Sequence, residues 1–210
     1  MVTEEGRGKR SGATRARILD AAFEAITADG IDGFRLGRIS ETAEVSTASI
    51  HYHFATRDEL LAEALLQAYD RAGEIRTELT GVGRGISQRL SDMVQHSLPD
   101  PRGDSWVLWV ELWLRAHRRP ALGPVAEELY SRMHDWFGAV IGEGVAAGEF
   151  SACDVGRTAD LAMALIDGFG HRVLWGDGNV SFEGACREVN RVLAGELGIE
   201  ALPDPTPLRD

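Results

Sequence analysis

A short helical segment near the start of the chain carries side chains suited to reading DNA. If an α-helix begins after Ser46, its apolar residues Ile50 and Phe54 point to one side. The opposite side then presents small or hydrogen-bonding residues, among them His51 and Tyr52. Such a compact face can enter a major groove roughly 12 Å wide and contact base edges and phosphates. The residues that we predict to contact DNA are Arg38, Ser46, Thr47, Ala48, Ser49, His51, Tyr52, His53, Thr56 and Arg57.

Neighbouring sequence signals define the helices that must hold this face. Ser46 is a helix N-cap residue, and Thr56 followed by Glu59 forms a capping box at the start of the next helix. A short helix precedes the reading helix, and a first helix over residues 13–29 closes the domain. The spacing therefore predicts a three-helix, helix-turn-helix domain over residues 13–60.

Three motifs follow one another between Arg17 and Leu61, namely RARILDAAFEAI, RISETAEVS and IHYHFATRDELL. In order and spacing they resemble the TetR family of bacterial transcriptional regulators. The resemblance implies an all-α protein of about nine helices, with an N-terminal DNA-binding domain and a larger helical domain for ligand binding and dimerisation. It also implies a cytoplasmic homodimer that binds double-stranded operator DNA, usually as a repressor, and is released by a small-molecule effector.

Several positions differ from the family pattern, and three of them concern the turn and the phosphate contacts. The glycine of the turn is Glu44 here, and a non-glycine residue in left-handed backbone costs roughly 1–2 kcal/mol. A tyrosine that contacts phosphate in the family is His51, and a lysine at the start of the following helix is Arg57. Both replacements can still bind phosphate. Arg57 also opposes the positive end of its helix dipole, a conflict that a DNA phosphate would resolve.

The charge distribution indicates weak DNA binding outside specific contacts. The 210 residues carry a net charge of −11, and residues 1–60 hold eight Lys or Arg against ten Asp or Glu. Residues 1–12 are predicted to form a flexible basic arm, which either contacts DNA or is simply disordered. The sequence shows no signal peptide and no membrane-spanning stretch, which predicts a cytoplasmic protein without a membrane partner. Isolated Cys153 and Cys186 are expected to be free thiols.

The larger domain is expected over residues 61–200, followed by a disordered tail over residues 201–210. The last two helices of this domain carry apolar stripes, and glycines permit a close approach of backbones. We therefore expect these helices to pair with a second subunit, with an ordinary monomer core as the alternative. The predicted dimer-interface residues are Leu161, Leu165, Gly168, Phe182, Cys186, Val189 and Leu193.

Tryptophans on one helical face mark a candidate effector site. Trp106, Trp109 and Trp113 are spaced i, i+3 and i+7, which is typical either of an aromatic core or of a cavity wall. Acidic residues such as Glu111 and Asp167 would let the site hold an organic cation. The segments WLRAHRRPAL and ALIDGFGHRVLWG also resemble the BetI-like branch of the family. The predicted ligand-binding residues are Trp106, Trp109, Trp113, Tyr130, His134, Trp136, Asp167 and His171.

Histidines in the second half of the chain keep a different class of function open. Asp167 and His171 are i, i+4 neighbours on one helical face. His117 and His134 lie on adjacent segments, so a helical enzyme or a metal-binding protein is one alternative, and an interaction scaffold is another. The sequence contains no HExxH, paired CxxC, phosphate-binding glycine loop or nucleophile elbow. We therefore expect neither catalysis nor a cofactor.

Overall fold

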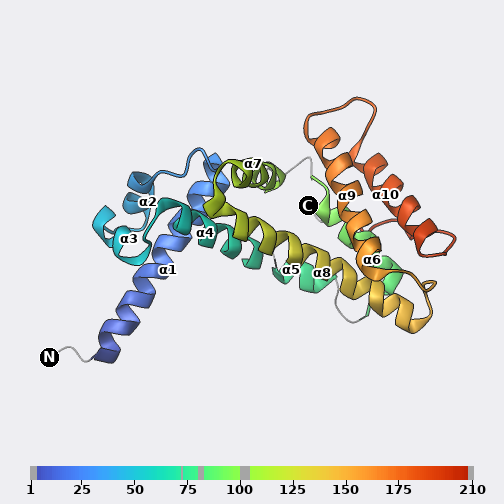
Figure 1. The fold of residues 1–210 in the computed structure, drawn as a ribbon, viewed down its shortest axis with the longest axis horizontal. Coiled ribbons are helices and arrows are strands. Elements are labelled where there is room, and N and C mark those ends of the chain that lie inside the picture. Colours follow the sequence, from blue (N-terminus) through green and yellow to red (C-terminus); the bar gives the residue numbers. More distant parts are fainter. Residues whose placement is uncertain (1–3, 72, 80–82, 100–104, 208–210) are drawn as a thin grey trace. The chain divides into compact units, whose positions relative to one another are not determined.

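A computed structural model describes residues 4–71, 73–79, 83–99 and 105–207, and within these ranges every regular element is a helix (Figure 1). This confirms the predicted all-α class. Ten α-helices are described in these ranges, where about nine were expected for the chain. The helices are α1 (Glu4–Asp29), α2 (Leu36–Thr42), α3 (Thr47–His53), α4 (Arg57–Arg71), α5 (Gly73–Leu79), α6 (Ile86–Ser97), α7 (Ser105–Arg118), α8 (Gly123–Ala147), α9 (Val155–Leu174) and α10 (Phe182–Glu196), with a short 3₁₀ helix at Pro120–Leu122.

The chain forms two compact units, and their limits differ from the predicted domain boundary at residue 60. Unit 1 contains residues 1–72 and 107–129, and unit 2 contains residues 73–106 and 130–210. Most of α7 therefore packs with the helix-turn-helix. A boundary of this kind depends on which surfaces meet in three dimensions, which helical periodicity does not reveal.

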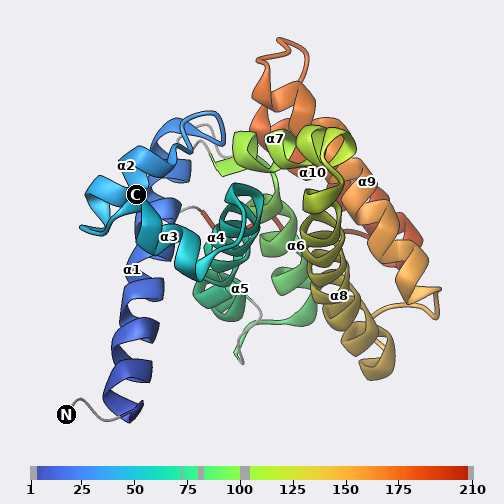
Figure 2. The same ribbon diagram turned by 60° about the vertical axis from the view of Figure 1, so that its left-hand side comes forward.

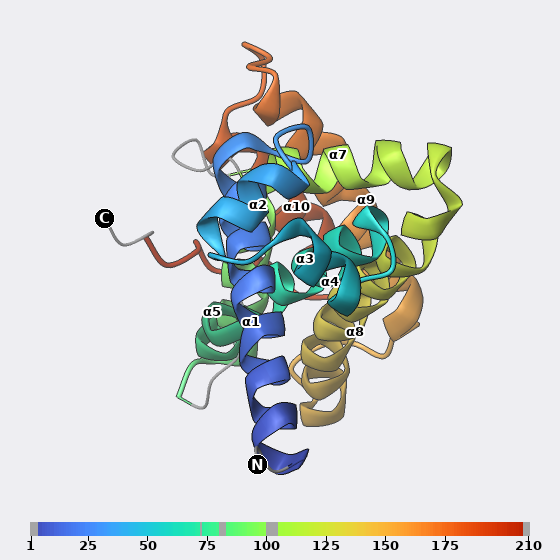
Figure 3. The same cartoon turned by 90° about the vertical axis from the view of Figure 1, so that its left-hand side faces the viewer.

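Unit 1 is built around α1, which lies against α2, α3 and α4 (Figures 2 and 3). The inner face of α1 carries Ile18, Ala22, Ala25 and Ile26, which are at most 2% exposed. The helix already begins at Glu4, whereas a flexible arm was expected up to residue 12. Residues 4–12 extend a helix whose later turns are packed, and adding residues to an existing helix costs little compared with starting one. Residues 1–3 of the predicted arm lie outside the described residues.

Unit 2 has a core formed by α6, α8, α9 and α10. The stripe predicted to form a dimer interface on α10 lies inside this core: Phe182, Cys186, Val189 and Leu193 are at most 8% exposed. These four side chains are therefore covered by their own chain, whereas they were expected to face a second subunit. Periodicity marks an apolar face on a helix but does not say whether that face meets the same chain or another.

The tail was expected to be disordered, but its described part is attached to α6. Leu202 is 8% exposed. The hydroxyl of Ser91 donates to the carbonyl oxygen of Pro203 at 2.7 Å, and the backbone N–H of Thr206 donates to a carboxylate oxygen of Asp92 at 2.6 Å. The tail lacks secondary structure, yet buried polar groups of α6 satisfy its backbone. Residues 208–210 lie outside the described residues.

Candidate DNA-reading surface and effector site

The turn between α2 and α3 has the geometry that its sequence predicts. Glu44 adopts a left-handed conformation with φ of 51°. The Ser46 hydroxyl caps α3 by accepting a hydrogen bond from the backbone N–H of Ser49 at 3.1 Å. The Ser40 hydroxyl donates to the carbonyl oxygen of Val45 at 2.6 Å, so that the turn is held from α2 as well. The cap and the left-handed residue together set the direction in which α3 leaves the turn.

Helix α3 separates its side chains into the two predicted faces. Ile50 and Phe54 are each 1% exposed, whereas Tyr52 is 80% exposed. His51 is exposed beside it, and Ser49 and His53 are half-buried. The remaining exposed residues of the predicted set are Arg38, Ser46, Thr47, Ala48 and Thr56. A small polar surface is therefore presented on α3.

The two arginines of the predicted set have partners within the chain. Arg38 forms an ion pair with Asp29. Arg57 donates from Nε and Nη2 to the carbonyl oxygen of Phe34 at 3.0 and 2.8 Å, and its guanidinium lies over the Phe34 ring. Burial, and then the nearby Arg119, lower the pKa of Arg57. A backbone carbonyl oxygen thus stabilises the guanidinium of Arg57, a role that we had expected a DNA phosphate to play.

The predicted capping box at the start of α4 is present, but the Glu59 carboxylate accepts from Ala55 instead of from Thr56. The Thr56 hydroxyl accepts from the backbone N–H of Glu59 at 3.0 Å. The Glu59 carboxylate accepts from the N–H of Ala55 at 2.7 Å. The helix that follows the reading helix is therefore fixed at its first turn.

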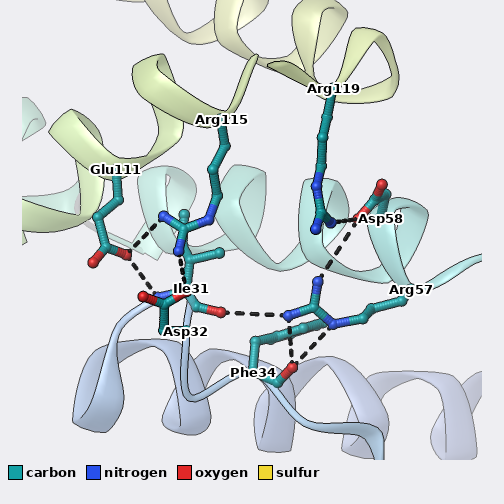
Figure 4. Close-up of polar contacts among 8 residues, drawn as sticks. All are labelled: Ile31, Asp32, Phe34, Arg57, Asp58, Glu111, Arg115 and Arg119. Atoms are coloured by element: carbon teal, nitrogen blue, oxygen red, sulfur yellow. Dashed lines mark hydrogen bonds and ion pairs between the residues drawn. The ribbon is translucent and has the colours of Figure 1, made fainter. Parts of the chain in front are cut away.

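Sequence reasoning missed a row of charged residues that runs along α7 to Arg119, the first residue after its end. Glu111, Arg115 and Arg119 are spaced four apart and reach toward the loop before α2 and the start of α4 (Figure 4). The i, i+4, i+8 spacing was the available signal, but it did not identify the partners, which lie 61 to 83 residues away in sequence.

The three tryptophans of α7 do not form a single wall. Trp109 belongs to unit 1, where its ring meets Tyr69 edge to face at 6.4 Å. Trp106 belongs to unit 2, where its indole N–H donates to the carbonyl oxygen of Ser97 at 2.9 Å. Its ring lies so close to Gly170 that a Cβ there would be 2.3 Å away. Trp106 therefore contacts α9 at Gly170.

Trp106, Tyr130, Asp167 and His171 of the predicted ligand set all belong to unit 2. The ring of Trp106 meets the ring of His171 edge to face at 5.2 Å. Partial burial raises the pKa of Asp167, and the nearby His171 offsets this rise by a smaller amount. Burial, followed by the charges of Asp160 and Asp167, raises the pKa of Tyr130. Electrostatics at this place favour an added positive charge.

Two other predicted ligand residues have different surroundings. His134 approaches the carbonyl oxygen of Gly156 at 3.2 Å and Asp160 at 3.6 Å. Trp136 packs beside the core of unit 2, edge to face with Phe137 at 5.5 Å. His134 is thus linked through Asp160 to the surroundings of Tyr130, whereas Trp136 packs with the core and Trp109 belongs to unit 1.

The contacts of Asp167 and His171 do not support the alternative of a metal or catalytic site. His171 Nδ1 lies 2.6 Å from the backbone carbonyl oxygen of Asp167, so the contact is not made with the carboxylate. The described part of the chain holds no cluster of three His, Cys, Asp or Glu residues arranged for a metal ion. Cys153 and Cys186 are free thiols, as expected. No helix in the described ranges is long and apolar enough to cross a membrane.

Family models match both halves of the chain. Residues 18–64 match the family described as bacterial regulatory proteins, tetR family. Residues 87–198 match the family described as BetI-type transcriptional repressor, C-terminal. The two matches together extend over the reading helix and most of unit 2.

Solved structures of related proteins share the fold. A transcriptional regulator from Saccharomonospora viridis in complex with choline is 27% identical, with a TM-score of 0.73, over 91% of this chain and 99% of that chain. The multidrug binding protein EbrR complexed with proflavin is 32% identical, with a TM-score of 0.61, over 85% of this chain and 99% of that chain. The nicotine-responsive transcriptional repressor HdnoR of Paenarthrobacter nicotinovorans is 28% identical over 120 residues, 56% of this chain and 61% of that relative. The chain therefore spans less than two thirds of the length of HdnoR.

Proposed function

This chain belongs to the TetR family of bacterial regulatory proteins and has a BetI-type C-terminal domain, and from this premise we propose that it is a ligand-responsive transcriptional repressor. It binds double-stranded operator DNA as a homodimer in the cytoplasm and leaves it when a small molecule binds. The family is one of regulators, so no catalysis is proposed. The observation that carries DNA binding is the division of α3 into a buried apolar face and an exposed polar face.

Specific contacts from α3 must supply most of the preference for the operator. Residues 1–60 carry more acidic than basic residues, so a general attraction to phosphates is weak. His51 and Tyr52 stand at the centre of the exposed face, with Thr47, Ala48 and Ser46 around them. Dimerisation is proposed through the outer side of α9, where Leu161 and Leu165 are half-buried and Gly168 is exposed.

A gel shift with the DNA upstream of the protein's own gene tests the assignment. Replacing His51 and Tyr52 together with Ala should abolish the specific shift and leave helix content and dimerisation unchanged. His117→Ala, an exposed histidine on α7, is the matched control and should bind as the wild type does. Undiminished binding by the double variant would contradict the proposed reading face.

The effector that fits unit 2 best is an organic cation held beside Asp167. A positive charge there would meet a carboxylate whose pKa is already raised by burial, and Trp106 and Tyr130 of the same unit carry aromatic rings of the kind that make cation–π contacts. The choline and proflavin complexes and the nicotine response of the relatives described above agree with this chemistry. Thermal shift with choline, nicotine and proflavin tests it, with 3,3-dimethyl-1-butanol as an uncharged analogue of choline. At least one cation should raise the Tm of the wild type but not of Asp167→Asn, and no shift from any of the three would refute the site.

A further inference from the structure

One face of α7 holds both chain segments that flank the reading unit α2–turn–α3. We propose that Glu111, Arg115 and Arg119, here called the α7 stripe, are positioning residues that set the orientation of α3 for DNA recognition. The inference rests on the proposed DNA-binding function. None of the three was predicted to contact DNA, and their contacts are made within unit 1 (Figure 4).

The first contact fixes the loop that leads into α2. A carboxylate oxygen of Glu111 accepts a hydrogen bond from the backbone N–H of Ile31 at 2.9 Å. Gly30 has a left-handed φ of 67°, and a Cβ at this position would lie 3.3 Å from the same carboxylate oxygen. A hydrogen bond to a charged acceptor is stronger than one between neutral groups. The glycine therefore permits both the turn of the loop and the close approach of Glu111.

The second contact strengthens the first. Arg115 forms an ion pair with Asp32 in the same loop. Its guanidinium also lies 3.3 Å from the carboxylate of Glu111, one turn earlier on α7. Ile31 and Asp32 of the loop are thus joined to two residues that lie one turn apart on α7. Two contacts restrict rotation of the loop more than a single contact would.

The third contact reaches the other end of the reading unit. Nη1 of Arg119 lies 3.0 Å from a carboxylate oxygen of Asp58, in the first turn of α4. Arg57, the preceding residue, is bonded to the carbonyl oxygen of Phe34 in the loop before α2. The entry to α2 and the exit from α3 are therefore connected to each other and to the same face of α7.

Exposure limits the stability that the ion pairs of Arg119 and Asp32 can supply, while the side chains of Glu111 and Arg115 are 26% and 23% exposed. The side chain of Arg119 is 50% exposed and that of Asp32 is 88% exposed. Exposed ion pairs contribute little to the free energy of unfolding because water screens them. The α7 stripe nevertheless links segments that sequence places far apart, so its loss should change the orientation of α3 more than it changes stability.

Operator affinity and amide exchange together test the proposal. The variants are Glu111→Ala, Glu111→Gln, which keeps a side-chain oxygen acceptor, and Glu127→Ala, which makes the same change in charge at an exposed residue of α8. Fluorescence anisotropy is measured with the DNA upstream of the gene and with an unrelated duplex of equal length. Arg119→Ala is compared with Arg118→Ala, since Arg118 is its exposed neighbour.

We expect Glu111→Ala to lose about fivefold or more in operator affinity relative to Glu127→Ala, while binding to the unrelated duplex is unchanged. Removing a negative charge would by itself favour DNA binding, so a loss points to orientation rather than to general electrostatics. Glu111→Gln should retain most of the affinity, and the amide of Ile31 should exchange faster only in the Ala variant. Arg119→Ala should bind the operator more weakly than Arg118→Ala does.

Equal operator affinities in Glu111→Ala and Glu127→Ala would overturn the proposal, as would equal losses on both duplexes. If the wild type does not prefer the upstream DNA, the repressor assignment fails instead. The stripe is then tested by amide exchange in α2 and α3. Faster exchange there in Glu111→Ala and Arg119→Ala than in their controls supports positioning, and unchanged exchange overturns it.

Discussion

Nη2 of Arg57 lies 2.8 Å from the carbonyl oxygen of Phe34, and the guanidinium lies over the ring of the same residue. A cation in the first turn of a helix opposes the helix dipole. Here the cation is stabilised by backbone oxygens, an aromatic face and the adjacent Asp58. The contact gives Arg57 an internal role that a lysine could not fill, because an ammonium lacks the planar fork of donors.

Replacing Arg57 with Lys separates the internal role from a phosphate contact. The charge is kept but the two bonds to Phe34 are lost, so we expect the free energy of unfolding to fall by about 1–2 kcal/mol. Urea denaturation followed by circular dichroism measures it. Arg118→Lys, an exposed change on α7, should be neutral. If the Arg57→Lys variant is as stable as the wild type, the contacts with Phe34 contribute nothing.

Glycine at position 44 should stabilise the protein. The left-handed backbone of Glu44 costs roughly 1–2 kcal/mol, and the added freedom of glycine in the unfolded chain offsets roughly 0.5–1 kcal/mol of the relief. We expect Glu44→Gly to gain about 0.5–1 kcal/mol in chemical denaturation. The control Glu41→Gly lies within α2 and should instead lose about 0.5–1 kcal/mol. Equal effects of the two changes would argue against strain in the turn.

Two glycines of α9 should respond in opposite ways to alanine. A Cβ at Gly170 would lie 2.3 Å from the ring of Trp106, so Gly170→Ala should cost about 1–3 kcal/mol and alter tryptophan fluorescence. A Cβ at Gly168 meets nothing within 4 Å in its own protomer, and alanine favours a helix, so Gly168→Ala should be neutral or stabilising for the fold of the protomer, whatever its effect on the proposed contact between subunits. Thermal unfolding compares them. An unchanged Tm in Gly170→Ala would show that Trp106 can move away freely.

Substitutions of two leucines, one on α9 and one on α10, should affect stability and dimerisation to different extents. Leu193 is fully buried, so Leu193→Ala should lower the free energy of unfolding by about 2–5 kcal/mol. Leu161 is only half-buried on α9, and Leu161→Ala should weaken dimerisation more than it lowers stability. Analytical ultracentrifugation and denaturation measure the two quantities. A dimer unaffected by Leu161→Ala would place the subunit contact elsewhere.

Stability should fall in mild acid because of His96. Burial, with a smaller effect of Arg76, lowers the pKa of this imidazole in the folded protein below its ordinary value of 6.5. The unfolded chain therefore binds a proton more readily, and the contribution to stability is present above pH 6.5 and is lost as the pH falls through the lowered pKa. His96→Gln should flatten this part of the stability profile, whereas the exposed control His117→Gln should leave it unchanged. Parallel profiles for the wild type and His96→Gln would exclude this histidine as the cause.

The sequence by itself was sufficient for features that depend on residues within one or two helical turns. The cap at Ser46, the left-handed turn at Glu44 and the two faces of α3 all follow from local hydrogen bonding and the helical repeat. The all-α class and the family resemblance were accessible for the same reason, since the motifs are continuous in sequence.

Only the tertiary structure decided what the remaining surfaces contact. It placed the α10 stripe in the core, attached the tail to α6 and assigned Trp106 and Trp109 to different units. Glu111 finds its partner at Ile31, 80 residues earlier in the chain. Periodicity shows which residues share a face, but the partner of that face depends on packing between distant segments. The exposed face of α3 could therefore be predicted, whereas the contacts that hold it in position could not.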